Sequence, residues 1–164
     1  MSDFDDLLAA NRTFADHFDL AGFDGIAKAG VAMVTCMDSR IDPLNMIGLK
    51  PGDAKILRNP GGRVTDDVLV AVVLSVALLQ VRRVIIVEHT RCAMASSTED
   101  EVHQRVTDFA GRDSTWMSLG VIEDQERQIR ADVHKVVSHP LVPDSIEVGG
   151  FVYDVDTGLL NQVV

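Results

Sequence analysis

Three short apolar runs constrain the fold of this chain more than any other feature. They occupy residues 31–37, 54–59 and 81–90, are rich in β-branched side chains, and lead into polar or turn-forming residues. Apolar runs without polar alternation are typical of strands that are buried on both faces, as in parallel sheets. Helical patterns lie between and after these runs, which is the order of an α/β fold. We therefore predict a mostly parallel β-sheet flanked by helices.

The segment between the second and third runs is the most apolar of the chain. Residues 68–79 contain a single polar side chain, Ser75. A membrane-spanning helix needs about 20 apolar residues, so this segment instead predicts a helix of the core or of a subunit interface. Thr65 is the expected N-cap, and the aspartates that follow it suit the first turn of a helix.

Further elements are expected on both sides of this region. A polar helical stretch begins around Cys92 and reaches residue 109, and an amphipathic helix covers residues 122–137. The tail from residue 149 consists of two extended segments around Asp156-Thr157-Gly158, which is typical of a hairpin. We expect residues 1–164 to form one domain, in which residues 1–30 are a helical N-terminal arm.

The charge of the chain excludes several kinds of partner. Its 164 residues include 15 Lys and Arg against 25 Asp and Glu, a formal net charge of -10. Binding to nucleic acid or to an anionic membrane surface requires clustered basic residues, which are not visible here. The N-terminus is acidic and mixed, unlike a signal peptide. We therefore expect a cytoplasmic protein without nucleic-acid or membrane partners.

Candidate metal ligands follow two of the predicted strands. Cys36 ends the first run, and His89 and Cys92 follow the third. Ligands of α/β sheets bind at the carboxyl ends of strands, where these side chains could meet. Two thiolates and an imidazole form a soft site for Zn²⁺, and three protein ligands leave one position open, as in catalytic sites. The alternatives are two buried cysteines that act as small apolar residues, or a single disulfide.

Asp38 and Arg40 extend this hypothesis from metal binding to catalysis. In an extended segment they share one face with Cys36, because residues two apart point the same way. A carboxylate beside a metal can accept a hydrogen bond from bound water, and a guanidinium can hold that carboxylate ionised and oriented. The alternative is an ordinary ion pair in a surface turn, which contributes little.

Four segments of the sequence resemble one known family. They read Cys-Met-Asp-Ser-Arg at 36–40, Gly-Leu-Lys-Pro-Gly-Asp at 48–53, Arg-Asn-Pro-Gly-Gly at 58–62, and His-Thr-Arg-Cys at 89–92. In this order they resemble the β-class carbonic anhydrases, and the short chain is similar to the compact bacterial members. The resemblance extends from about residue 30 to the end, including the tail.

The resemblance implies a zinc lyase, carbonate dehydratase, that hydrates CO₂ reversibly to bicarbonate and a proton by means of a zinc-bound hydroxide. It implies one zinc per chain, held by Cys36, His89 and Cys92. Asp38 and Arg40 would then be the catalytic pair. The backbone of Gly61 and Gly62 is expected to approach the metal closely and to line the substrate site. The resemblance also implies a homodimer or a dimer of dimers.

Two departures from the family pattern bear on the substrate. Ala93 stands where a glycine commonly follows the second cysteine, and Arg91 stands where compact relatives often carry an aspartate. One alternative is therefore a hydrolase of carbonyl sulfide or carbon disulfide at the same zinc site. A second alternative is a catalytically silent, zinc-bearing structural or regulatory homologue.

Overall fold

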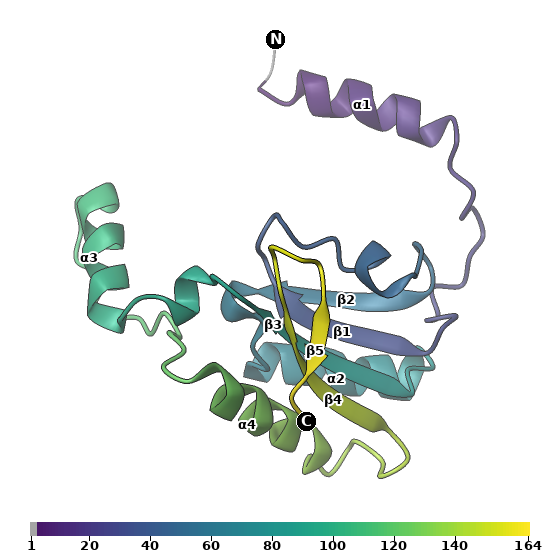
Figure 1. Cartoon of the computed structure of the whole chain (residues 1–164). Helices are drawn as coiled ribbons and strands as arrows, with labels where there is room; N and C mark the ends of the chain where they lie inside the picture. Colours follow the sequence, from purple (N-terminus) through teal and green to yellow (C-terminus); the bar gives the residue numbers. More distant parts are fainter. Residues whose placement is uncertain (1–2) are drawn as a thin grey trace.

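The computed structural model describes residues 3–164, which form a five-stranded sheet in the order β2-β1-β3-β4-β5 (Figure 1). The strands β1 to β4 are mutually parallel, and only β5 runs antiparallel, on the edge beside β4. This arrangement confirms the predicted mostly parallel sheet and the terminal hairpin. The strands are Val31–Cys36 (β1), Ala54–Asn59 (β2), Arg83–His89 (β3), Glu147–Tyr153 (β4) and Leu160–Gln162 (β5).

Four α-helices accompany the sheet, and two of them begin later than the sequence predicts. The helices are Asp5–Ala15 (α1), Asp66–Leu78 (α2), Glu99–Ala110 (α3) and Gln125–Val137 (α4). A 3-10 turn follows Cys92, and α3 starts only where Thr98 and Glu101 form a reciprocal capping box. The side chain of Asp124 caps α4 at the backbone N–H of Arg127. Local capping therefore decides both boundaries.

The main core lies between the sheet and two helices on the same face. Ala32 and Val34 of β1 alternate toward this face, in register with Val84 and Ile86 of β3. They pack with residues of α2 and α4 that are themselves buried, namely Val72, Ile129, Val133 and Val136. One face of the apolar segment at 68–79 thus belongs to the core, the first of the two predicted alternatives, whereas Val70, Leu74 and Leu78 on its other face are exposed. Within residues 3–164, no helix is long and apolar enough to cross a membrane.

The N-terminal arm lies apart from this core. Residues 1–2 of the predicted arm are outside the described residues. The helix α1 stands away from the sheet in Figure 1, and none of its residues is buried. Large apolar side chains in α1 and next to its ends are exposed and recur at helical spacing. These residues are Phe4, Leu7, Leu8, Phe14 and Phe18. The chain as a single copy therefore leaves an apolar helix face uncovered.

Candidate metal centre

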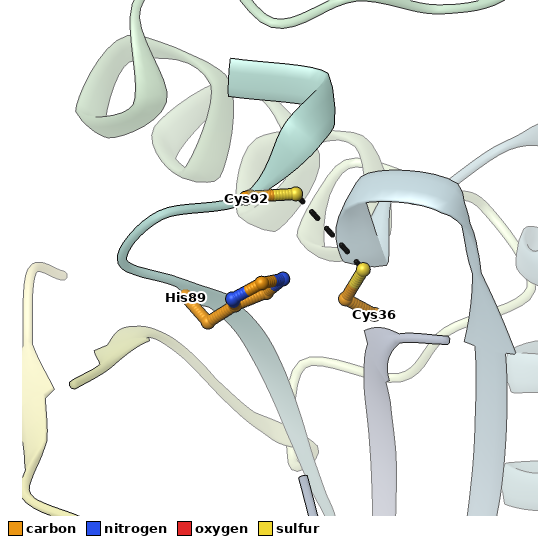
Figure 2. A group of neighbouring side chains, drawn as sticks. All are labelled: Cys36, His89 and Cys92. Carbon is orange, nitrogen blue, oxygen red and sulfur yellow. Dashed lines mark hydrogen bonds between the residues drawn. The ribbon is translucent and has the colours of Figure 1, made fainter. Parts of the chain in front are cut away.

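Three side chains with metal-binding groups meet at the carboxyl edge of the sheet. Cys36 is the last residue of β1 and His89 the last of β3, and these strands are parallel neighbours. Cys92 is the N-cap of the 3-10 turn that follows β3. All three are buried, their ligand atoms lie within 4.8 Å of one another, and the two sulfurs are 4.0 Å apart (Figure 2). The structure thus brings the three predicted ligands together.

The orientation of the His89 ring fits a metal. Its Nδ1 lies 2.9 Å from the carbonyl oxygen of Thr90, which can only accept, so Nδ1 carries the proton. Nε2 is then an acceptor, and it is buried without a hydrogen-bond partner within residues 3–164. Buried polar atoms are normally paired, and a metal-bound histidine usually anchors its other ring nitrogen on an acceptor in this way. Two sulfurs and this nitrogen are a donor set that zinc prefers.

The two free thiols share a hydrogen bond between their sulfur atoms. Their hydrogen bond lowers the pKa of Cys36 to about 4 and raises the pKa of Cys92, because the pair shares one proton. The backbone N–H groups of Asp38 and Gly61 also help to lower the pKa of Cys36. One thiolate therefore forms readily without any metal, and a cation would displace the remaining proton.

Arg40 binds the Asp38 carboxylate through a bidentate hydrogen bond. Its Nε donates to Oδ1 at 2.9 Å and its Nη2 donates to Oδ2 at 2.7 Å, while its backbone N–H also donates to Oδ1 at 2.9 Å. These hydrogen bonds hold the pKa of Asp38 well below its usual value. Oδ2 lies 3.8 Å from Nε2 of His89, so an ionised carboxylate stands beside the ligand group.

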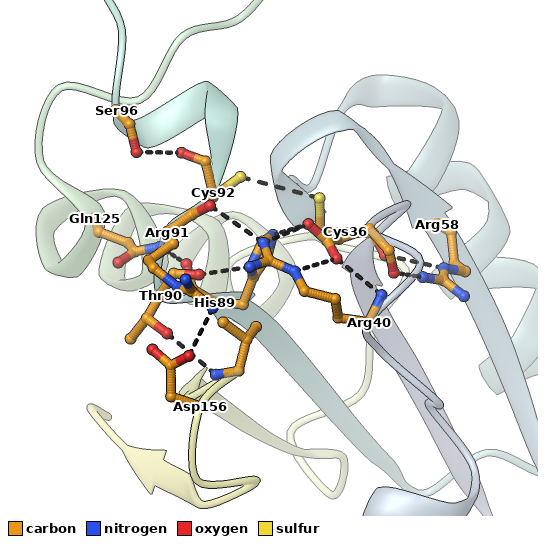
Figure 3. Close-up of polar contacts among 12 residues, drawn as sticks. Cys36, Arg40, Arg58, His89, Thr90, Arg91, Cys92, Ser96, Gln125 and Asp156 are labelled. Atoms are coloured by element: carbon orange, nitrogen blue, oxygen red, sulfur yellow. Dashed lines mark hydrogen bonds and ion pairs between the residues drawn. The ribbon is translucent and has the colours of Figure 1, made fainter.

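Two polar residues that the sequence interpretation did not single out fix the backbone of the ligands. Arg58 of β2 donates its Nε to the carbonyl of Cys36 at 2.9 Å and its Nη2 to that of Asp38 at 2.6 Å. Gln125, at the start of α4, donates its Nε2 to the carbonyl of His89 at 2.9 Å (Figure 3). Because these bonds end on backbone atoms, no spacing of side chains predicts them. Only the position of Arg58 inside the motif at 58–62 gave a signal.

The glycine pair brings backbone against the ends of the ligand strands. Gly61 and Gly62 have φ values of 80° and 73°. A Cβ on Gly62 would lie 2.8 Å from the carbonyl oxygen of Val87 and 2.9 Å from the nitrogen of Cys36. No side chain fits there, so the backbone of Gly62 lies directly against the end of β1, at Cys36.

A buried acid beside the ligands was not anticipated. Glu88 precedes His89 in β3 and is fully buried, and its carboxylate oxygens have no hydrogen-bond partner within the described chain. Burial raises the pKa of Glu88 to about 8, although the charge of Arg63 opposes this. Burial therefore favours the neutral form of Glu88 behind the strand that carries His89.

Fold and site together define a class of protein. Structural zinc sites are usually closed by four protein ligands, whereas catalytic sites have three and keep one position open. The group at this sheet edge has three, and it lies where α/β enzymes bind their ligands. The class is thus an α/β protein with three side chains that could hold a metal ion in the manner of a catalytic site.

Comparison with known proteins gives the family. A family model described as carbonic anhydrase matches residues 31–160. Beta-carbonic anhydrase 1 of Mycobacterium tuberculosis is 36% identical over 163 residues, covering 97% of this chain and 96% of the relative. The crystal structure of a carbonic anhydrase from Streptococcus mutans superposes with a TM-score of 0.89 at 36% identity, covering 100% of this chain and 99% of that one. The chain belongs to the β-carbonic anhydrase family.

Other similar proteins are named for a different activity, carbon disulfide hydrolysis. The carbon disulfide hydrolase of Acidianus sp. is 30% identical over 159 residues, covering 80% of this chain and 78% of the relative. Its identity and coverage are lower than those of the mycobacterial carbonic anhydrase. The comparisons therefore confirm the fold class, the family and the enzyme class predicted from the sequence.

Proposed function

We propose that this chain interconverts CO₂ and bicarbonate at one zinc ion held by Cys36, His89 and Cys92. The observation that carries the proposal is Nε2 of His89, which is buried without a partner in residues 3–164 and belongs to a cluster with two free thiols. A buried polar atom left unsatisfied is costly, and a soft cation would remove that cost. The ionised Asp38 beside this cluster supplies the acceptor that hydration chemistry needs.

The mechanism assigns a separate task to each residue around the cluster. Zinc held by these three residues would act as a Lewis acid and would supply a nucleophilic water near neutral pH. Oδ2 of Asp38, beside the ligand His89, would accept a hydrogen bond from that water and orient it. Arg40 keeps Asp38 ionised and fixed through its two-pronged hydrogen bond. The proton released in hydration then passes to solvent buffer.

We assign the lining of the substrate site to the backbone of Gly61 and Gly62. Both glycines are buried, and Gly62 lies against the nitrogen of Cys36. A Cβ on Gly61 would lie 2.9 Å from Cδ1 of Ile122, so the backbone of Gly61 packs directly against an aliphatic side chain. CO₂ is small, linear and apolar, so a wall of backbone and aliphatic carbon matches its chemistry.

One experiment tests the function directly. Purified protein is loaded with metal, its zinc content is measured by elemental analysis, and CO₂ hydration is followed by stopped flow. We expect about one zinc per chain and rapid hydration. Metal-replete protein without zinc would overturn the ligand assignment, whereas zinc-loaded protein without any turnover would indicate a silent homologue.

The second candidate keeps the zinc and changes the substrate to carbonyl sulfide or carbon disulfide. The relative from Acidianus sp. named carbon disulfide hydrolase favours it, as do the unusual residues Arg91 and Ala93 on either side of Cys92. The attack on a linear substrate is the same in both cases. Side-by-side rates with CO₂, carbonyl sulfide and carbon disulfide on one preparation separate the two candidates.

We also propose that the working form is a homodimer or a dimer of dimers. Apolar side chains of α1 are exposed, and so is a ridge on the outer side of α2 formed by Val70, Leu74 and Leu78. Such contiguous apolar surface is typical of interfaces. A second copy that covers it would explain why α1 has no buried residue in one chain.

A cytoplasmic location belongs to the same proposal. Cys36 and Cys92 are free thiols, and free thiols persist in reducing compartments. Zinc binding requires both in the reduced form, so an oxidising compartment would compete with the proposed metal site.

A further inference from the structure

The turn between the ligands His89 and Cys92 is held by the terminal hairpin. The backbone N–H of Thr90 donates to the carbonyl of Tyr153 at 2.9 Å, and the N–H of Val155 donates to Oγ1 of Thr90 at 3.1 Å. Both partners lie at the end of β4 and the start of the turn that leads to β5. The ligand turn is therefore docked on a second turn far away in the sequence.

Arg91, the next residue of this turn, has an unfavourable backbone conformation. Its φ is 54°, in the left-handed region, which residues other than glycine rarely adopt. Strained conformations of this kind persist only where the surrounding structure holds them. The side chain of Arg91 helps to stabilise this backbone conformation, because its Nη2 donates to Oδ1 of Asp156 at 2.6 Å (Figure 3).

The same residue reaches the catalytic pair through its backbone. The carbonyl of Arg91 accepts a hydrogen bond from Nη2 of Arg40 at 3.3 Å, and that Nη2 also binds Asp38. Asp38 is the main cause of the raised pKa of Arg40, and the charge of Asp156 contributes to it as well. A chain of contacts thus runs from Asp156 through Arg91 to Arg40.

We propose that Arg91 and Asp156 form a clamp that positions Arg40, and through it the carboxylate of Asp38. The inference rests on the proposed function and goes beyond it, since it makes Arg91, a departure from the family pattern, a positioning residue. The clamp fixes the left-handed backbone at Arg91, and this backbone aims the carbonyl at Arg40. Neither member touches the reacting atoms.

Exposure determines what kind of effect the clamp has. The side chains of Arg91 and Asp156 are 60% and 61% exposed. An ion pair so exposed adds little to the free energy of unfolding. A positioning role therefore predicts a change in the contacts of Arg40 and in turnover, with the melting temperature and the zinc content close to those of the unmodified protein.

Charge reversal and its rescue test the clamp. In Arg91→Glu a new carboxylate faces Asp154 and Asp156, so the turn is repelled from the hairpin, and glutamate gains no advantage over arginine in the left-handed region. We expect turnover to fall between about 10- and 100-fold, the loss typical of small displacements of a positioning group. Exchange of the Arg40 Nε–H with water, measured by ¹⁵N NMR and assigned with Arg40→Lys, should become faster. The double variant Arg91→Glu/Asp156→Arg restores opposite charges and should restore both readouts.

A matched control is the pair Arg127–Glu123, whose atoms are 3.9 Å apart and whose side chains are 77% and 86% exposed. Arg127→Glu makes the same change of charge in α4 and should leave both readouts unchanged. The clamp is overturned if Arg91→Glu retains normal Arg40 exchange and turnover, or if the folded double variant is not rescued. If the unmodified protein lacks CO₂ hydration, the proposed function fails, and the exchange of Arg40 still tests the clamp.

Discussion

The carboxyl edge of the sheet is fixed by tertiary hydrogen bonds, whereas the N-terminal helix α1 is not packed against the core. At the sheet edge, Arg58, Gln125 and the terminal hairpin bind the backbone around the metal cluster. The helix α1 has no buried residue, although its apolar face is as regular as that of a core helix. One chain thus builds the geometry of its proposed metal site but leaves an apolar arm uncovered. Changes at the edge should act on metal and turnover, and changes at the arm on assembly.

The largest effect is expected from Cys36→Ser. A serine hydroxyl is not deprotonated by zinc as a thiol is, and the proposed site has three protein ligands among residues 3–164. Zinc should fall from about one per chain to a small fraction, and CO₂ hydration should fall with it. Elemental analysis and circular dichroism measure metal and fold. Met37→Leu changes the exposed neighbouring residue and should retain the metal. Full zinc occupancy in Cys36→Ser would remove Cys36 from the site.

The next effect is expected from Asp38→Asn. The amide keeps the shape of the side chain but places an N–H₂ group against the donors of Arg40, so the two-pronged hydrogen bond is lost. Turnover should fall about 100-fold, the lower range for a positioned acid–base group, while zinc stays bound.

Asp42→Asn is the matched control, because Asp42 is another aspartate that accepts hydrogen bonds within its own turn, from Asn45. A simple surface ion pair at Asp38 would change the free energy of unfolding by only about 0–1 kcal/mol and leave turnover intact. Unchanged stopped-flow rates in Asp38→Asn would therefore remove the pair with Arg40 from the mechanism.

Comparing these residues shows what a sequence can predict. The placement of Cys36 and His89 follows from two apolar strand runs, since parallel neighbours end at the same edge of the sheet. The bond from Gln125 to the carbonyl of His89 has no such signature. It depends on where α4 begins, and that is decided by the cap at Asp124 rather than by the apolar period from residue 122.

Tertiary contacts also decided the features that the patterns missed. The strand pattern of β3 implies that position 88 is buried, but it does not reveal which charges act on Glu88, because Arg63 and Asp132 come from distant segments. The left-handed backbone of Arg91 likewise depends on contacts with the terminal hairpin and not on a turn-forming residue. Strand positions are local information, whereas these features are set by packing.

Gly62→Ala tests how tightly the edge is built. A Cβ there would lie 2.8 Å from one backbone atom and 2.9 Å from another, on a residue with φ +73°. Left-handed strain and overpacking together should lower the free energy of unfolding by about 3 kcal/mol. Gly111→Ala has φ +63° and nothing within 4 Å, so strain alone should cost about 1 kcal/mol. Urea unfolding of both variants measures the difference, and equal losses would show that close packing at Gly62 is unimportant.

The smallest effect on the single chain is expected from Leu7→Glu in α1. Leu7 lies on the apolar face with Phe4 and Phe14, whereas Ala9 points to the opposite side of the helix. Burying a leucine contributes about 2 kcal/mol, and a symmetric dimer buries it twice. The loss of about 4 kcal/mol corresponds to dimerisation on the order of 1000-fold weaker.

Light scattering across a dilution series measures this change, with Ala9→Glu as a control that adds the same charge on the other face. Because the metal ligands lie in a different region, zinc content should remain the same in both variants. An unmodified protein that is a monomer at every concentration, or a Leu7→Glu variant that keeps the mass of the assembly, would mean that α1 is not an interface element. The apolar face of the arm would then have to be covered by something other than a second copy.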